Sequence, residues 1–268
     1  MKTLLLSLLM SSVAWGQVSQ VGISNFNFNY QAPQGNGTAD AFSYQQKIEA
    51  GQNVQVEKVG EDFKILLEGV ENRELTFKNA PDIIKNANTI KLSAFNFSFA
   101  EKLLLTLNTA VFNSPDKTVD LKNLNLGCDR IATFPEVMDQ VISGCIQKMS
   151  LKTGGLSTNG ESGFDQALMK AIDEGHDQIL GQVGLKNVSL KVNGGKFDLS
   201  ADIQAQISGT AKSTGSIKYE ATIKKITVKI SEVKFGFLDV TSKVFDELKK
   251  QENATFKVKN PYIYITVK

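Results

Sequence analysis

The sequence predicts an α+β protein dominated by β-structure, in which long, curved antiparallel sheets pack against two or three amphipathic helices. From Leu185 to Phe237, apolar and polar residues alternate almost without interruption, as they do in strands that bury one face. Turn residues such as Asn193-Gly194-Gly195 interrupt the alternation. Three other segments repeat their apolar residues at helical spacing instead. A sheet with one apolar face, covered by helices, is therefore expected.

The first sixteen residues have the features of a secretory signal peptide. Lys2 supplies the positive charge, and residues 4–13 are mostly apolar. Ala14 and Gly16 are the small residues at positions −3 and −1 of a cleavage site before Gln17. The apolar stretch is too short to span a bilayer. No cysteine follows it directly, so we expect no lipoprotein anchor. The sequence thus predicts an exported protein, periplasmic or secreted.

Residues 17–152 are predicted to form a β-rich N-terminal half. The alternation in residues 21–30 slips phase once, which indicates a β-bulge near Asn25. A loop rich in Gly, Pro and Asn is expected over residues 31–40, and Pro81 to Asn86 can form one helical turn. Further strands are expected at residues 54–59, 63–67, 74–78, 90–99, 103–112 and 118–126.

Short phrases recur along the chain. Residues 23–28 (ISNFNF) resemble residues 92–97 (LSAFNF), and residues 121–126 (LKNLNL) resemble residues 185–190 (LKNVSL). The matches are short, and alternation alone can produce such similarity.

Three amphipathic helices are predicted. Thr133-Phe134-Pro135-Glu136 resembles a capping box before apolar residues at helical spacing up to Met149. Residues 153–163 are predicted as a linker, and residues 164–268 as a C-terminal half that opens with a helix over residues 164–180. A last helix is predicted near Asp239, and strands are predicted after it at 255–258 and 262–267. The helix is expected to bury four apolar residues: Val240, Val244, Phe245 and Leu248.

The phase of the alternation changes at Lys224-Lys225. Ile217 and Ile223 lie on odd positions, whereas Ile226 and Ile230 lie on even ones. Because two lysines are unusual in a tight hairpin turn, a bulge that bends one long strand is expected here.

The two cysteines, Cys128 and Cys145, are expected to form a disulfide in an exported protein. His176 is the single histidine, and without further histidines or paired cysteines nearby it indicates no metal site. No nucleophile motif or phosphate-binding loop is present. We therefore expect no enzyme and no cofactor.

Charge argues against nucleic acid as a partner. Lys and Arg number 30 against 28 Asp and Glu, and the charges are spread along the chain. Nucleic-acid binding needs a basic stripe, which is missing. Four Asn-X-Ser/Thr sequons occur, a number that chance explains in a chain rich in these residues.

The order of elements from Phe164 to Lys268 resembles the LmeA-like phospholipid-binding family of exported bacterial proteins. That resemblance implies a long curved sheet that wraps a helix around an apolar tunnel, as in the tubular lipid-binding folds. It implies a non-catalytic protein that binds phospholipid or another apolar ligand, with peripheral membrane contact. The expected groove residues share the apolar faces of the long strands: Leu190, Val192, Phe197, Leu199, Ile203, Ile207, Tyr219, Ile223, Val228 and Phe235.

Other interpretations stay open. The same ten side chains can form a packed core, as most apolar strand residues do. A structural or adhesive envelope protein without a ligand would show the same alternation. An outer-membrane barrel would alternate as well, although its aromatic girdles are sparse here and amphipathic helices argue against it.

Overall fold

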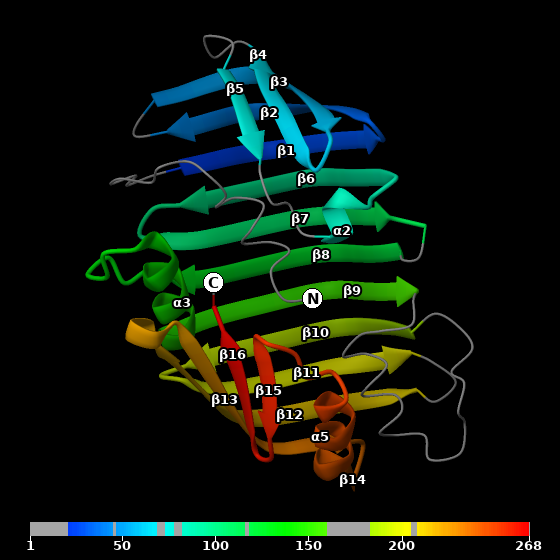
Figure 1. Ribbon diagram of the computed structural model, residues 1–268, viewed down its shortest axis with the longest axis vertical. Helices are drawn as coiled ribbons and strands as arrows, with labels where there is room; N and C mark the ends of the chain where they lie inside the picture. The colour runs from blue at the N-terminus through cyan, green and yellow to red at the C-terminus, as the bar shows by residue number, and fades with distance from the viewer. Residues whose placement is uncertain are drawn as a thin grey trace. The chain divides into compact units, whose positions relative to one another are not determined.

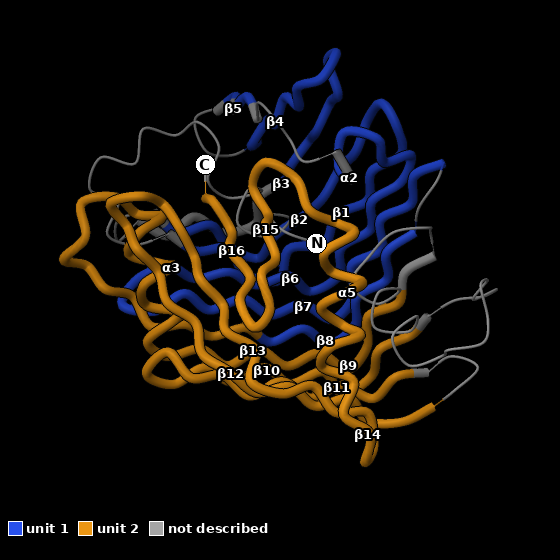
Figure 2. The backbone as a smooth tube through the Cα atoms, turned by 60° about the horizontal axis from the view of Figure 1, so that its bottom comes forward, with its two compact units in different colours: residues 1–125 blue, residues 126–268 orange. Residues whose placement is uncertain are grey.

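The computed structural model describes residues 21–44, 47–68, 73–77, 82–115, 118–159, 183–204 and 208–267. Two compact units divide the chain, residues 1–125 (unit 1) and 126–268 (unit 2), and Figures 1 and 2 show their elements. The predicted signal peptide and the predicted helix over residues 164–180 lie outside the described residues. The β-dominated fold class is confirmed, since antiparallel pairing joins the strands within each unit.

Unit 1 is an antiparallel sheet in the order β7-β6-β1-β2-β3-β4-β5, with an open strand path. Strand β8 (Thr118–Asp129) runs across the boundary between the units. The short helix α2 forms where one helical turn was predicted. The remaining bounds are β1 Val21–Gln31, β2 Gln34–Tyr44, β3 Lys47–Val59, β4 Asp62–Glu68, β5 Arg73–Phe77, α2 Asp82–Lys85, β6 Thr89–Phe99 and β7 Lys102–Asn113.

The loop predicted over residues 31–40 is wrong, because most of it belongs to β2. Glycines normally weaken a strand, but aromatic rings from β1 cover two of them here. A Cβ added to Gly37 would lie 2.9 Å from the ring of Phe26 and 3.1 Å from that of Phe28. A Cβ added to Gly35 would lie 2.9 Å from the ring of Phe28 and 2.9 Å from Cα and Cβ of Tyr30. These glycines therefore provide space for rings inside a continuous strand.

The recurring phrases share a backbone feature. The third residue of each phrase has a positive φ: Asn25 at 49°, Ala94 at 49°, Asn123 at 52° and Asn187 at 49°. The pairing register shifts at Asn25 and again at Asn187, which confirms the predicted bulge at Asn25. Three of the phrases, those at Asn25, Ala94 and Asn187, thus mark bulges, which bend a strand and increase its twist.

In unit 1 two of these bulges are tied to each other by asparagine side chains. Asn96 accepts a hydrogen bond at 2.8 Å from the backbone N–H of Asn25, and Asn27 accepts one at 3.0 Å from that of Ala94. The exchange satisfies the two N–H groups that the bulges withdraw from the strand ladder. The asparagines at positions 27 and 96 thus supply the acceptors that these two backbone N–H groups need.

The hairpin β1–β2 has a counterpart in unit 2, the hairpin β10–β11 (Val183–Asn193, Lys196–Gln204). The Asn25 side chain donates to Asp40 at 3.1 Å, and the Asn187 side chain donates to Asp202 at 2.8 Å, with a separation of 15 residues in both pairs. The two hairpins therefore repeat one asparagine–aspartate bond, although the register shifts between β1 and β6 in unit 1 and between β10 and β11 in unit 2. Five residues recur in the two hairpins, Val21, Gly22, Asn25, Ala39 and Asp40, matched by Val183, Gly184, Asn187, Ala201 and Asp202.

Unit 2 is an antiparallel sheet in the order β9-β10-β11-β12-β13-β16-β15, with β14 paired to β13. Figure 1 shows α3, the hairpin β15–β16 and α5 on the same side of strands β9 to β13. The remaining bounds are α3 Val137–Gln147, β9 Lys148–Asn159, β12 Gly209–Glu220, β13 Lys225–Phe235, β14 Leu238–Asp239, α5 Thr241–Lys249, β15 Phe256–Lys259 and β16 Tyr262–Thr266.

Two predictions about chain organisation differ from the structure. Residues 153–159 of the expected linker form the end of β9, and the division between compact units falls after Asn125. The bulge expected at Lys224 is wrong as well. A 3₁₀ turn over Ala221–Ile223, followed by Lys224 at φ 49°, joins β12 to β13 as an antiparallel hairpin.

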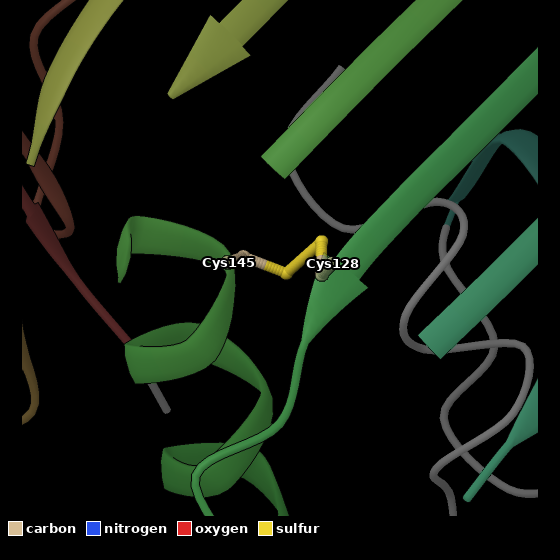
Figure 3. The surroundings of a disulfide bond; sticks show 2 residues. All are labelled: Cys128 and Cys145. Carbon is tan, nitrogen blue, oxygen red and sulfur yellow. A yellow bond between two sulfur atoms is a disulfide. The ribbon is translucent and has the colours of Figure 1, made fainter. Parts of the chain in front are cut away.

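Helix α3 is fastened to the strands around it. The predicted disulfide between Cys128 of β8 and Cys145 of α3 is present (Figure 3). Gly194 and Gly195, in the β10–β11 turn, donate hydrogen bonds of 2.9 and 3.0 Å to the carbonyls of Gln147 and Ile146. These bonds satisfy carbonyls that the helix end leaves free.

The start of α3 differs from the predicted capping box. The helix begins at Val137, and its N-cap residue Glu136 makes no side-chain capping hydrogen bond. Helix α5 begins close to the predicted position and buries Val244, Phe245 and Leu248, as expected. No helix in the described part of the chain has the length and apolar character needed to traverse a lipid bilayer.

Candidate functional site

One face of the unit 2 sheet carries the apolar residues of the long strands. Residues directly opposite each other in an antiparallel pair point to the same face. The register places Leu190 opposite Leu199 and Ile217 opposite Val228. Odd-numbered residues of β11 and β12 therefore share this face with Leu190, as the alternation in the sequence indicated.

Much of this face is packed by the chain itself. Val244, Phe245 and Leu248 of α5, together with Phe256 and Val258 of β15, belong to the same core cluster as the strand residues. Ile203 is 1% exposed and Val192 is 4% exposed. Side chains buried to this extent form a core and leave no room for a ligand beside them.

A second set of apolar residues on this face is only partly buried. We call it the apolar stripe, and it crosses six strands that are neighbours in the sheet, β9, β10, β11, β12, β13 and β16. Its members pack against the core on one side and are reached by solvent on the other: Met149, Leu185, Leu190, Leu199, Ile217, Val228 and Ile265.

The structure places nine of the ten predicted groove residues, in four different environments. Leu190, Leu199 and Val228 lie in the apolar stripe. Ile223 is 57% exposed in the turn before β13, and Tyr219 is half-buried with its hydroxyl hydrogen-bonded to Asp139. Ile207 lies outside the described residues. The other four belong to the core cluster: Val192, Phe197, Ile203 and Phe235.

A polar cluster joins α3 to the β12–β13 hairpin. The Lys224 ammonium donates hydrogen bonds of 2.8 Å to both oxygens of Asp139 and one of 2.7 Å to Glu136. The Tyr219 hydroxyl donates to Asp139 at 2.5 Å. Asp139 is 4% exposed, so these bonds supply the partners that a buried carboxylate requires.

The pKa values in this cluster are moved away from neutrality. Burial by itself would raise the pKa of Asp139, but the hydrogen bonds from Lys224 and Tyr219 outweigh it and the pKa is lowered. Burial and the bond to Asp139 raise the pKa of Tyr219 to about 12. Hydrogen bonds to Asp139 and Glu136 raise the pKa of Lys224. Groups with these shifts keep one protonation state at neutral pH, in which Asp139 and Lys224 are charged and Tyr219 is neutral, so they suit a structural contact and not proton transfer.

Within the described ranges, no group of three or more His, Cys, Asp and Glu side chains is placed to hold a metal ion. His176 lies outside these ranges.

Comparisons with models of protein families, with curated proteins and with solved structures find no match for this chain. The function must therefore be argued from the apolar face and its surroundings.

Sequence reasoning missed four members of the apolar stripe. Met149 was assigned to the end of a helix, whereas it is the second residue of β9 and pairs with Val192. Ile217 and Ile265 have the parity of the core residues on their strands but were not singled out. Leu185 has the opposite parity to Leu190, because the bulge at Asn187 changes the phase of β10. The same alternation, extended along β12, could have found Ile217, whereas Leu185 could be found only by placing the bulge.

Proposed function

We propose that this chain binds an apolar ligand, such as the acyl chain of a phospholipid, on the apolar stripe of unit 2, and that it does so without catalysis. The observation that carries the proposal is the stripe itself: seven partly exposed apolar side chains from six neighbouring strands on one face. An acyl chain lying on them would gain about 0.8 kcal/mol per buried methylene.

Two features of the chain agree with an exported carrier. The Cys128–Cys145 disulfide is typical of oxidising compartments outside the cytosol. Residues 1–16 have the pattern of a secretory signal, and the resemblance of the C-terminal half to the LmeA-like family implies the same ligand class. Phospholipid is therefore the first ligand to test.

The experiment is native mass spectrometry of the protein purified from the exported fraction without detergent, followed by lipid extraction. A stoichiometric lipid adduct is expected. A matched pair of variants on β11 then places it: Leu199→Gln puts a polar group in the stripe, and Ser200→Gln changes the opposite face of the same strand.

Leu199→Gln should lose the adduct while Ser200→Gln keeps it. If wild-type protein gives a bare mass, and that mass stays unchanged after incubation with phospholipid vesicles, the proposal fails. A structural or adhesive β-protein without ligand would then be the better interpretation. Retention of the adduct by Leu199→Gln would move the site away from the stripe.

A further inference from the structure

The turn between β13 and β14 exposes an aromatic side chain to solvent. Phe237 is 91% exposed, and Leu238 beside it is 50% exposed. Among the described residues, the next most exposed large apolar side chain is Ile223 at 57%. The turn thus presents two adjacent apolar side chains, with one of them almost wholly in water.

The backbone of this turn is held firmly on both sides. Phe235 and Val240 are 9% and 4% exposed and belong to the core cluster. Gly236, at φ 59°, donates its N–H to the carbonyl of Thr210 at 3.0 Å, and Val240 donates to Val233 at 2.9 Å. The exposure of Phe237 is therefore fixed by a packed and hydrogen-bonded frame.

Folding gives no reason for a phenylalanine at this position. The positive φ that favours glycine is satisfied by Gly236, and a Cβ on that glycine would meet nothing within 4 Å. The following position in such a turn usually carries a polar residue. Phe237 and Leu238 thus form a small apolar surface on a fixed turn, which a partner can cover.

The size of the exposed surface favours a lipid bilayer over a protein as that partner. Phe237 and Leu238 together offer on the order of 200 Å², whereas a stable protein interface covers about 800 Å² on each side. Insertion of one or two apolar side chains among lipid headgroups gives weak, reversible attachment instead. Lys212 of β12 adds an exposed cationic group opposite Lys234 of β13, and the Lys234 ammonium is ion-paired with Glu232 at 2.7 Å.

We infer that the β13–β14 turn is a membrane anchor, in which Phe237 and Leu238 insert into the interfacial region of a lipid bilayer. The inference rests on the proposed function in one respect, since it supplies the surface from which a lipid would reach the stripe. The ring of Phe235 lies over Gly209, which pairs with Ile203, and Ile203 pairs with Leu185 of the stripe. The anchor is therefore at one end of the apolar face.

The sequence allows a direct test, because Trp15 is the one tryptophan of the chain. In the full chain carrying Trp15→Phe, Phe237→Trp introduces a single fluorescent reporter at the turn. The matched control is Leu104→Trp in the same background, since Leu104 of β7 is 48% exposed in unit 1. Both are mixed with phosphatidylcholine vesicles, with vesicles containing phosphatidylglycerol, and with vesicles of brominated lipid.

The reporter at residue 237 should shift its emission to the blue and be quenched by brominated lipid, and the reporter at residue 104 should do neither. Phe237→Ser should weaken sedimentation with vesicles about tenfold or more. An unshifted reporter at 237 would overturn the anchor, as would equal shifts at 237 and 104. A blue shift without vesicles that grows with protein concentration would indicate self-association instead and overturn it too.

The ligand experiment on Leu199 separates the two proposals. If Phe237→Ser loses vesicle binding but keeps its lipid adduct, the anchor and the carrier are both supported. If the protein binds vesicles through residue 237 but carries no lipid, the anchor stands and the proposed carrier function fails.

Discussion

Replacement of Ile203 by alanine distinguishes a packed core from a ligand-binding face. Ile203 is 1% exposed and lies within the core cluster of unit 2, so its removal leaves a cavity that the neighbouring side chains cannot fill. Substitutions of this kind cost about 2–5 kcal/mol of unfolding free energy. At about 3 °C per kcal/mol for a unit of this size, Tm should fall by roughly 6–15 °C.

The matched variant is Leu199→Ala, two residues earlier on the same strand and the same face. Leu199 is partly buried in the apolar stripe, so part of its surface is already hydrated and its loss should cost about 1 kcal/mol or less. Thermal unfolding followed by far-ultraviolet circular dichroism measures both variants. Lipid content by native mass spectrometry is recorded for the same samples.

Burial predicts that Ile203→Ala lowers stability far more than Leu199→Ala does. The reverse outcome would refute the reasoning: a Tm for Ile203→Ala within about 2 °C of wild type, together with loss of the lipid adduct. Ile203 would then line a ligand space, as the sequence-based prediction had it, and the core cluster would be packed more loosely than its burial indicates.

Three further predictions concern the devices that hold the bulges and α3. Reduction of Cys128–Cys145 should lower the unfolding free energy by about 3 kcal/mol, measured as a shift of the urea midpoint that is missing in a Cys128→Ala/Cys145→Ala double variant. The lowered pKa of Asp139 means that its contribution is complete at neutral pH and is lost as pH falls below about 4, so Asp139→Asn should flatten the acid side of a plot of Tm against pH. Asn187→Val should cost about 1–2 kcal/mol, because a β-branched residue resists φ 49°, and chemical denaturation should show Asn187→Gly to be less destabilised.

The basic side of the same pH profile follows from Tyr219. Its pKa of about 12 lies above the value of about 10 for an unfolded chain, so folding favours the neutral phenol. Its contribution is complete below pH 10 and is lost as pH rises toward 12. Tyr219→Phe should remove this part of the alkaline loss.

Local patterns predicted those parts of the fold that depend on neighbouring residues. The alternation from Leu185 onward predicted that β10 to β13 are strands with one apolar face, and the spacing of Val244 and Leu248 predicted α5. The slip of phase at Asn25 predicted its bulge, which the register shift between β1 and β6 confirms. Each of these features is encoded within about ten residues of the chain.

Features that depend on distant residues were not predicted. Lys224 adopts the left-handed backbone conformation in the β12–β13 turn, and its ammonium donates hydrogen bonds to Asp139. Asp139 lies 85 residues earlier in the chain. Gly154 and Gly155, with the composition of a linker, lie in β9, where Gly155 stands opposite Lys186 of β10, 31 residues later in the chain. Neither arrangement leaves a trace in local composition.

The candidate site shows the same division. The parity of the strands identified the correct face, but it could not separate core from stripe. That separation depends on distant elements: side chains of α5 and of the hairpin β15–β16 belong to the same core cluster as Ile203, whereas Leu199 is only partly buried against that cluster. A sequence pattern reports which side of a strand is apolar, and only the fold reports what lies against it.

The repeated bulge has a consequence for how sequences of this kind diverge. We call the positive-φ asparagine and its bond to an aspartate fifteen residues later, as in Asn25–Asp40 and Asn187–Asp202, the corner. Most of the apolar residues in the flanking strands differ between the two hairpins. Overall identity can then disappear while the corner persists. A search keyed to the spacing of asparagine and aspartate in successive hairpins would recover chains that share this corner and that a comparison of whole sequences passes over.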